Sequence, residues 1–288
     1  MRVLVTGATG FVGSHVVAAL AKRGHQCVAF GRRSFPPADR VEPFRGDILE
    51  GNRLLEAAEG CEAVVHLVGI IREYPKTGIT FQRLHVEATE RVVEVCKELG
   101  ISLLLHMSAL GASPSSSARY HQTKYAAEEV VRNSGLRYAI FRPSLVVGPG
   151  SRFLRDMKRL LSLRVVGVIA REFRLQPVAV RDVAMAFAEA LGAPAFWGES
   201  WDLCGPEVFS LRELLQTMAR VWGMKVLFLP LPLAPVRVLA SLLDDLSWFP
   251  ITREQLTMLE EGSICSGKGV FSLLNRQPTP IEEELSLF

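Results

Sequence analysis

The segment from Arg2 to Gly24 reads RVLVTGATGFVGSHVVAALAKRG, and it decides the fold. Its apolar, β-branched start predicts a strand over Arg2–Thr6. Apolar residues then recur at helical spacing, so a helix is predicted over Phe11–Arg23, with Gly24 as its end. The segment therefore predicts a strand that passes through a short glycine-containing turn directly into a helix.

Three glycines in this turn are spaced three residues apart. Gly7 permits the tight turn, Gly10 lets the backbone approach a pyrophosphate, and Gly13 allows close packing of the helix on the strand. The free N–H groups and the dipole at the helix N-terminus favour phosphate. The alternative is a simple packing turn, since the spacing differs from the standard G-x-G-x-x-G motif. We predict a dinucleotide-binding loop whose contacts are Gly7, Thr9, Gly10, Phe11, Val12 and Gly13.

The end of the second predicted strand, Gln26–Phe30, indicates which dinucleotide is bound. Proteins that bind NAD place Asp or Glu near this point to hold the ribose 2′-hydroxyl. This chain has Gly31-Arg32-Arg33 instead, and an arginine can pair with a 2′-phosphate. We therefore predict NADP(H) in preference to NAD(H). The alternative is that both arginines are ordinary surface charges.

Two further strand ends carry predicted cofactor contacts. Asp47 and Ile48 follow the third predicted strand, where the Asp47 carboxylate can accept a hydrogen bond from the adenine amino group. The alternative for Asp47 is a helix or turn cap. Val68 and Gly69 end the fourth predicted strand, Ala63–Leu67, where a small residue lets the backbone lie against the cofactor. Gly69 could equally be a plain turn.

The rest of the first half repeats the alternation of strand and helix. This alternation implies right-handed βαβ units and a parallel sheet. We predict an α/β fold of the Rossmann type, with a doubly wound parallel sheet and a smaller, mixed, helix-rich C-terminal lobe. The predicted strands are 26–30, 41–45, 63–67, 103–107 and 138–142, and the predicted helices are 52–59, 80–99 and 120–134.

The alternation weakens after Pro149. The predicted dinucleotide-binding core covers residues 1–150 and is rejoined by 174–200. Residues 151–173 and 201–288 form the predicted smaller lobe, which would face a substrate or a partner.

Several local signals place elements in this second part. A strand at 175–180 is predicted to return to the sheet, and Asp182 is predicted to cap the helix that follows. Ser210–Glu213 and Thr252–Gln255 have the pattern of capping boxes, so each predicts the start of a helix.

The composition limits the possible functions. The 33 basic and 30 acidic residues leave a net charge of +3 over 288 residues, too little for a broad field that attracts nucleic acid. The five cysteines, at 27, 61, 96, 204 and 265, have no CxxC or zinc spacing. We therefore expect no metal site and buried free thiols in a reducing compartment. Because no apolar leader follows Arg2, the expected location is cytoplasmic.

The mean hydropathy of +0.21 is high for a soluble chain. The longest apolar stretch contains three prolines and Arg237, which argue against a membrane-spanning helix. An apolar helix is predicted over Val236–Leu246, and Trp248 and Phe249 follow it. Residues 226–249 are predicted either to contact a membrane surface or a hydrophobic partner, or to pack inside the smaller lobe.

Tyr120 and Lys124 lie four residues apart on a predicted helix, so their side chains share one face. A free tyrosine has a pKa of about 10, too high for proton transfer near neutrality. A nearby ammonium favours the phenolate and lowers that pKa, so the pair can act as a general acid and base on a hydroxyl or carbonyl group. The alternative is a surface pair on an exposed helix, and His121 beside it is expected to be solvated.

Five motifs occur together over residues 1 to about 190. They are Gly7-x-x-Gly10-x-x-Gly13, Gly46-Asp47, Tyr120-x-x-x-Lys124, Arg142-Pro143-Ser144 with Gly148-Pro149-Gly150, and Val178-x-x-x-Asp182-Val183-Ala184. In combination they resemble the extended short-chain dehydrogenases/reductases, the NAD-dependent epimerase/dehydratase superfamily. The resemblance implies that Pro143 and His85 also contact the cofactor.

The second part narrows this resemblance. The segments WDLCGPE at 201–207 and SLREL at 210–214, followed by the proline-rich apolar stretch, are similar to an atypical subgroup of the superfamily. That subgroup contains the nucleotide-binding accessory subunit of mitochondrial respiratory complex I and its bacterial relatives. The similarity implies tightly bound NADPH and, in the complex I subunit, a largely structural role.

The chain departs from the pattern of the catalytic members at two places. These members have a serine at the end of the fifth strand, where Ser108 could serve, but many place it one or two residues later, where Ala109 and Leu110 stand. His85 occupies the position of their helix asparagine. It can substitute as a hydrogen-bond donor, or it can be a buried histidine satisfied by backbone groups.

Two hypotheses follow. The first is an NADP(H)-dependent oxidoreductase or epimerase-like enzyme with Tyr120 as acid and base, Lys124 as the group that lowers its pKa, and Ser108 orienting the substrate oxygen. The second is a non-catalytic NADPH-binding structural or assembly protein of a respiratory or quinone-related membrane system, favoured by His85 and by the apolar stretch.

Overall fold

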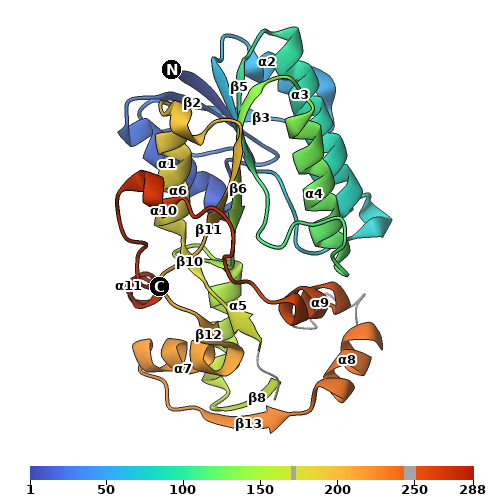
Figure 1. The fold of residues 1–288 in the computed structure, drawn as a ribbon, viewed down its shortest axis with the longest axis vertical. Helices are drawn as coiled ribbons and strands as arrows, with labels where there is room; N and C mark the ends of the chain where they lie inside the picture. Colours follow the sequence, from blue (N-terminus) through green and yellow to red (C-terminus); the bar gives the residue numbers. More distant parts are fainter. Residues whose placement is uncertain (170–172, 243–250) are drawn as a thin grey trace.

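The central sheet has seven strands in the order β11-β6-β5-β4-β1-β2-β3 (Figure 1). The structure is a computed structural model that describes residues 1–169, 173–242 and 251–288. All strand pairs in this sheet are parallel. The strands are β1 (Arg2–Thr6), β2 (Gln26–Gly31), β3 (Val41–Arg45), β4 (Ala63–His66), β5 (Leu103–Met107), β6 (Arg137–Pro143) and β11 (Glu199–Leu203). The predicted Rossmann-type sheet is thus confirmed.

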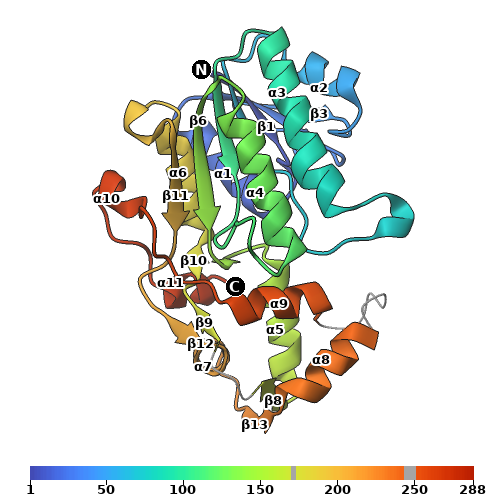
Figure 2. The same cartoon turned by 45° about the vertical axis from the view of Figure 1, so that its right-hand side comes forward.

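Helices cover both faces of the sheet (Figures 1 and 2). On one face α1 (Phe11–Lys22) packs on α6 (Val180–Ala190). On the other lie α2 (Gly51–Ala58), α3 (Ala88–Glu98) and α4 (Arg119–Arg132). Each face buries its own apolar cluster, which explains why the central strands consist almost entirely of apolar residues. The strand order reverses at β1 and β4, and in such sheets ligands bind at the carboxyl ends of the strands near that reversal.

The single helix predicted over 80–99 is interrupted in the structure. Residues Gln82–Glu87 form a π-helical segment, and α3 follows it directly. A π-helical turn changes the angular spacing of the side chains along a helix. His85 lies within this segment and is completely buried. Two short 3-10 turns, Pro75–Thr77 and Pro194–Phe196, complete this half.

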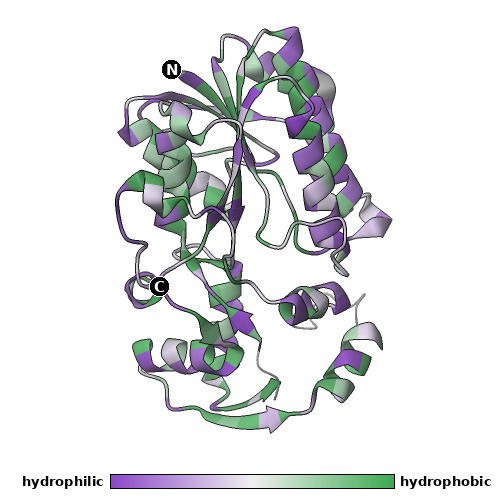
Figure 3. Cartoon of the chain, viewed as in Figure 1, coloured by the Kyte–Doolittle hydropathy of each residue, from purple (hydrophilic) through white to green (hydrophobic). Residues whose placement is uncertain are grey.

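The smaller lobe has its own apolar core. Strands β8 (Val165–Ile169) and β13 (Leu227–Leu231) pair in parallel at its far end, where Figure 3 shows mostly hydrophobic residues. The helices of this lobe and of the C-terminal segment are α5 (Arg152–Ser162), α7 (Leu211–Val221), α8 (Leu233–Leu242), α9 (Arg253–Glu261), α10 (Phe271–Leu274) and α11 (Ile281–Ser286). Both predicted capping boxes are present, at the starts of α7 and α9.

The apolar helix predicted over Val236–Leu246 begins earlier than expected, since α8 spans Leu233–Leu242. Residues 243–250, which include Trp248 and Phe249, lie outside the described residues. Across the described ranges, none of the helices combines the length and the apolar character needed to cross a membrane.

The return of the chain to the sheet differs from the prediction. Residues 175–180 do not join the sheet; β9 (Arg174–Leu175) pairs with β12 (Phe209–Ser210), and β10 (Val178–Ala179) pairs with β7 (Val146–Val147). Pro177 lies between them, and proline cannot donate a ladder hydrogen bond. The strand that joins the sheet is β11, which pairs with β6.

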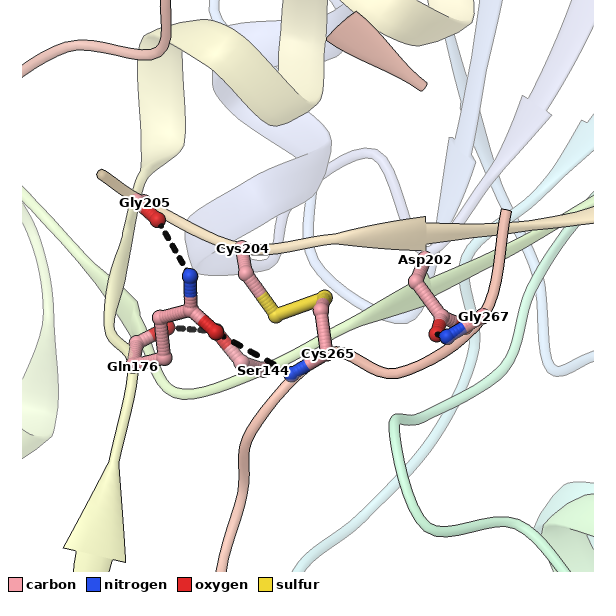
Figure 4. Close-up of a disulfide and its surroundings, with 7 residues drawn as sticks. All are labelled: Ser144, Gln176, Asp202, Cys204, Gly205, Cys265 and Gly267. Atoms are coloured by element: carbon pink, nitrogen blue, oxygen red, sulfur yellow. Dashed lines mark hydrogen bonds between the residues drawn. A yellow bond between two sulfur atoms is a disulfide. The ribbon is translucent and has the colours of Figure 1, made fainter. Parts of the chain in front are cut away.

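Two of the five predicted free cysteines form a disulfide, Cys204–Cys265. The segment after α9 runs beside the end of β11, where the Asp202 N–H donates to the Lys268 carbonyl and the Gly267 N–H donates to the Asp202 carboxylate (Figure 4). The two cysteines are 61 residues apart in the chain, so spacing gave no signal of this contact. The other three cysteines are free and buried, as predicted.

Asp182 does not cap α6, contrary to the prediction. The N-cap residue is Ala179 and has no side-chain cap. The Asp182 carboxylate is completely buried. It accepts hydrogen bonds from the Thr279 N–H at 2.6 Å and the Thr279 hydroxyl at 2.9 Å. A buried carboxylate requires such partners, and here they come from the C-terminal segment, which it ties to the core.

Candidate functional site

The glycine loop has the geometry that close approach of a cofactor requires. Gly7 has a φ of 73°, which glycine adopts without strain. The Gly10 N–H donates to the Gly7 carbonyl at 2.9 Å. A Cβ on Gly13 would lie 2.2 Å from the Gly7 carbonyl oxygen. The start of α1 therefore packs directly on the turn, and its N-terminus faces the carboxyl edge of the sheet.

The arginines predicted to hold the 2′-phosphate lie at the end of β2, beside this loop. The Arg33 guanidinium donates to the Thr9 carbonyl at 3.0 Å, and both Arg32 and Arg33 are exposed. A Cβ on Gly31 would lie 2.8 Å from the Thr9 hydroxyl. The end of β2 and the glycine loop are thus in contact, and an arginine side chain lies at that contact.

The predicted contacts at the ends of the next two strands have different surroundings. Asp47 accepts a hydrogen bond from the Leu49 N–H at 3.0 Å, so its carboxylate caps a turn, the alternative considered from the sequence. Ile48 is 4% exposed and belongs to the apolar core. By contrast, the backbone at Val68 lies against the glycine loop, since a Cβ on Gly7 would meet it at 3.1 Å.

Gly69, His85 and Lys124 come together at the carboxyl edge of the sheet. A Cβ on Gly69 would lie 3.6 Å from His85 Nε2 and 3.9 Å from Lys124 Nζ. The Lys124 ammonium donates to the Met107 carbonyl at 2.6 Å, at the end of β5. Burial lowers the pKa of Lys124 to about 8, against an opposing effect of the Glu128 carboxylate.

His85 is satisfied inside the protein. Its Nδ1 lies 2.9 Å from the Thr123 hydroxyl, and its Nε2 lies 3.1 Å from the Ile70 carbonyl oxygen. Burial lowers the pKa of His85 to about 2, and the Lys124 ammonium acts in the same direction. The imidazole is therefore neutral. This arrangement matches the alternative considered from the sequence, a buried histidine bonded to backbone and neighbouring groups.

Two more buried histidines lie near enough to Lys124 for its charge to act on them, and no sequence motif indicated them. His66 and His106 stack with ring centroids 5.3 Å apart on β4 and β5. Burial lowers the pKa of His66 to about 3 and that of His106 well below its usual value, and Lys124 contributes to both shifts. The Lys124 ammonium thus lies near neutral imidazoles.

Tyr120 lies on the same helix face as Lys124, but its predicted pKa shift is wrong for this structure. Its ring packs edge-on against those of Phe81 and His85, with centroids 5.8 and 5.4 Å away. Burial raises the pKa of Tyr120 to about 12. The Lys124 ammonium is directed to the Met107 carbonyl, so desolvation of the phenolate dominates. In this state the Tyr120 phenol keeps its proton.

Ser108 follows β5 and is 2% exposed. Its hydroxyl is buried and has no hydrogen-bond partner within the described residues, although its N–H donates to the Phe141 carbonyl at 2.7 Å. A buried polar atom without a partner is costly, unless a ligand supplies one. Pro143 is adjacent, since its carbonyl accepts from the Leu110 N–H at 2.9 Å.

The N-terminus of α4, which carries Tyr120, is capped by residues that the sequence did not indicate. Its N-cap residue is Ala118, without a side-chain cap. Glu254 of α9 accepts from the Tyr120 N–H at 2.7 Å. Glu261 accepts from the Ser117 N–H at 2.6 Å. Orphan N–H groups at a helix start need such acceptors, so Glu254 of α9 supplies a missing cap, and Glu261 holds the residue that precedes the N-cap.

His121 takes part in the same contact and is not solvated, contrary to the prediction. It is 3% exposed, and its Nδ1 lies 2.6 Å from a Glu261 carboxylate oxygen. The sequence signal near these residues was the capping box at the start of α9. It predicts where that helix starts, but it does not predict that the side chains of Glu254 and Glu261 reach the N-terminus of α4.

These residues fit a nicotinamide dinucleotide on two observations. A Cβ on Gly7, Gly10 or Gly13 would meet backbone atoms, so none of these three positions carries a side chain at the helix start, where a pyrophosphate binds. The partnerless Ser108 hydroxyl and the buried Lys124 both lie at the end of β5, since the Lys124 ammonium donates to the carbonyl of Met107, the residue before Ser108. For metals there is no comparable fit: the described residues hold no cluster of ligating side chains.

Comparison with known proteins agrees with this geometry. The profile of the NAD dependent epimerase/dehydratase family matches residues 3–198. The chain belongs to this family. Members of this family bind NAD(P). The match over residues 3–198 confirms the family assignment made from the sequence motifs.

Individual relatives include a reductase and a subunit of NADH dehydrogenase. The chain is 33% identical over 248 residues to the plant mitochondrial NADH dehydrogenase [ubiquinone] 1 alpha subcomplex subunit 9 of Arabidopsis thaliana, covering 80% of this chain but 60% of that protein. It is 27% identical to the ceramide reductase of Caulobacter vibrioides, covering 87% of this chain and 79% of that one. The chain thus spans less than two thirds of the plant relative.

A solved structure shows the same fold over almost the whole chain. The NADPH-dependent quinone oxidoreductase of Escherichia coli, determined with NADPH, has a TM-score of 0.77 and 20% sequence identity, covering 99% of this chain and 98% of that one. The smaller lobe is therefore part of a known architecture rather than an addition specific to this chain.

Proposed function

We propose that the protein is an NADP(H)-dependent oxidoreductase or epimerase-like enzyme that acts on a carbonyl or hydroxyl group. The observation that carries this proposal is the convergence of Ser108, Tyr120 and Lys124 on one sheet edge, beside Gly69. When bound, the nicotinamide would carry the hydride that the substrate carbon receives or gives up.

The chain's own groups then handle the substrate oxygen. The Ser108 hydroxyl, which lacks a partner, donates a hydrogen bond that orients this oxygen. Because the pKa of Tyr120 is about 12, its phenol is protonated and donates the proton when the carbonyl is reduced. Oxidation of a hydroxyl group requires the Tyr120 phenolate as the base. A cation placed beside the phenol, such as the Lys124 ammonium, would lower the pKa of Tyr120 and favour the phenolate.

The preference for NADP(H) rests on the charge at the end of β2. Arg33 already lies at the glycine loop through its bond to Thr9, and Arg32 is exposed beside it. Arginine binds a phosphate through several charge-assisted hydrogen bonds. The double variant Arg32→Ala, Arg33→Ala should weaken NADPH binding and leave NADH binding nearly unchanged, as measured by fluorescence titration. Equal losses for both nucleotides would contradict the preference.

Turnover is tested with purified protein, NADPH and a panel of quinones, β-keto esters and sugar nucleotides. We expect oxidation of NADPH with at least one class and its loss in Tyr120→Phe, which keeps the ring packing but removes the proton. Activity that survives this variant would reject Tyr120 as the acid.

A second candidate is a non-catalytic NADPH-binding structural or assembly protein of a respiratory system. Two observations favour it: Lys124 is engaged with the Met107 carbonyl rather than with Tyr120, and the 33%-identical plant relative is a subunit of NADH dehydrogenase. Tight NADPH binding without turnover over the whole panel would support this candidate and reject the first.

A further inference from the structure

The smaller lobe contains an apolar cavity of about 270 Å³. Its walls come from β8, β13, α7 and α8, and from the residue that precedes the α9 cap. Its lining residues are Gly167, Val168, Ile169, Leu211, Leu215, Leu231, Val236, Leu239 and Ile251. None of them has a polar side chain, and none belongs to the cofactor site.

Such a cavity suits an apolar ligand. Water gains few hydrogen bonds from walls of this kind, and an apolar cavity of roughly 150 Å³ stays dry and binds benzene. Gly167 keeps the space open, because a Cβ there would lie 2.3 Å from Leu231 Cδ1. Leu231 and Leu239 line the cavity and are also 40% and 47% exposed. The cavity therefore opens to the surface between β13 and α8.

One residue of the cavity wall lies close in sequence to a residue that contacts the helix carrying Tyr120. Ile251 is the residue directly before Thr252, which caps α9. Glu254, in the first turn of that helix, accepts the hydrogen bond from the Tyr120 N–H at 2.7 Å. The wall of the cavity and the backbone of the helix that carries Tyr120 are thus linked through four consecutive residues.

We propose that this cavity binds the alkyl chain of the substrate, so that the reacting molecule is a carbonyl or hydroxyl compound with a long alkyl or acyl chain. The proposal rests on the proposed oxidoreductase function for the reacting end of that molecule. The apolar lining accounts for the chain, and Ile251 in the cavity wall directly precedes α9, whose Glu254 accepts from the Tyr120 N–H.

Binding is tested first, without any reaction. cis-Parinaric acid, a fluorescent fatty acid, serves as the probe for the alkyl chain. Val236→Phe puts a ring into the cavity, and its matched control is Val238→Phe, the same change on the same helix at a side chain that is 58% exposed and does not line the cavity. We expect Val236→Phe to weaken probe binding by about tenfold or more, since each methylene excluded from burial is worth about fourfold. Val238→Phe should bind as the wild type does.

A second pair guards against misfolding of Val236→Phe. Leu239→Gln introduces a polar group into the lining without adding volume, and Leu242→Gln makes the same change at a side chain that is 75% exposed and outside the lining. Leu239→Gln should weaken probe binding and Leu242→Gln should not, with NADPH binding equal in all four variants. Probe binding unaffected by both cavity variants would overturn the proposal.

Turnover then separates a substrate chain from a lipid chain. Ethyl 3-oxobutanoate and ethyl 3-oxodecanoate present the same reacting group on a short and a long chain. We expect a higher kcat/KM for the long ester in the wild type and in Val238→Phe, and loss of that advantage in Val236→Phe. Equal kcat/KM for both esters overturns the proposal while the proposed function stands.

The remaining outcomes are also decisive. The wild type can bind the probe and Val236→Phe can lose that binding while neither ester nor any compound of the wider panel is turned over. This result rejects the proposed function, and it also rejects the substrate as the source of the alkyl chain. In that case, flotation with phosphatidylglycerol vesicles that is reduced in Val236→Phe but not in Val238→Phe would assign the cavity to a membrane lipid instead.

Discussion

The glycine loop and the N-terminus of α4 meet the same edge of the sheet, but they are built in different ways. In the glycine loop the turn itself is made by a local contact, in which Gly13 packs on Gly7, six residues earlier; the end of β2 and the backbone at Val68 then lie against the finished turn. The N-terminus of α4 is held by Glu254 and Glu261, which lie 134 and 144 residues away from their partners. The cofactor loop is therefore encoded in one segment, whereas the position of Tyr120 depends on the docking of another lobe.

The largest effect is expected in the local region, for Gly13→Ala. The added Cβ would lie 2.2 Å from a backbone oxygen that cannot move aside. We expect a loss of about 4 kcal/mol in the free energy of unfolding, above the usual cost of about 1–3 kcal/mol for overpacking because the clash is with backbone, together with loss of NADPH binding. Gly192→Ala is the control, because a Cβ there meets nothing within 4 Å. Urea denaturation of both variants measures the difference, and similar stabilities would refute the local origin of the loop geometry.

The next largest effect concerns the attachment of the C-terminal segment. Cys204–Cys265 closes a loop with a sequence separation of 61, and such a link typically contributes about 2–4 kcal/mol. Cys204→Ser should lower the free energy of unfolding by that amount under oxidising conditions. Added dithiothreitol should destabilise the wild type to the same level and leave the variant unchanged. A response of the variant to dithiothreitol would show that another thiol is involved.

The third prediction concerns the charge of Lys124. Its pKa is lowered from 10.5 to about 8 in the folded protein, so between these values the unfolded chain binds more protons than the native one. Stability therefore rises with pH over that window, by up to about 3 kcal/mol. Lys124→Met removes the titration, so the stability of the wild type relative to this variant should increase from pH 8 to 10.5. A constant difference would mean that burial does not shift this pKa.

The smallest effect is expected for the cap that comes from the other lobe. Glu254→Gln keeps an acceptor for the Tyr120 N–H but removes the charge, which favours a helix N-terminus by about 0.3–1 kcal/mol. The free energy of unfolding should fall by about that amount. If the cap positions Tyr120, kcat should fall while the Kd for NADPH stays unchanged. The matched control is Glu260→Gln, on the same helix but paired with Arg237. Equal kcat values in the two variants would remove any positioning role.

The sequence predicted the parts of the site that depend on short stretches of chain. The strand, turn and helix of Arg2–Lys22 follow from periodicity and from glycine's freedom at Gly7, and the structure has them as expected. The shared face of Tyr120 and Lys124 follows from helix geometry alone. What the helix could not reveal is the direction of the Lys124 ammonium, toward the Met107 carbonyl, and hence the pKa of Tyr120.

Two of the expectations that were wrong have one feature in common. The local pattern indicates a cap of its own helix for Asp182 and solvent for His121, but both side chains are buried against residues far along the chain, Thr279 and Glu261. A polar residue in a helical pattern has the same local signal whether it faces water or a distant partner. Only the path of the chain distinguishes these two environments.

The amino-acid sequence by itself determined the α/β alternation and the glycine loop of this protein, because these depend on backbone hydrogen bonds and side-chain periodicity within a few residues. The tertiary structure decided the caps of α4, the Cys204–Cys265 link and the cavity of the smaller lobe. Each of these joins segments separated by tens of residues or more, and their meeting depends on how whole elements pack, which no local pattern records.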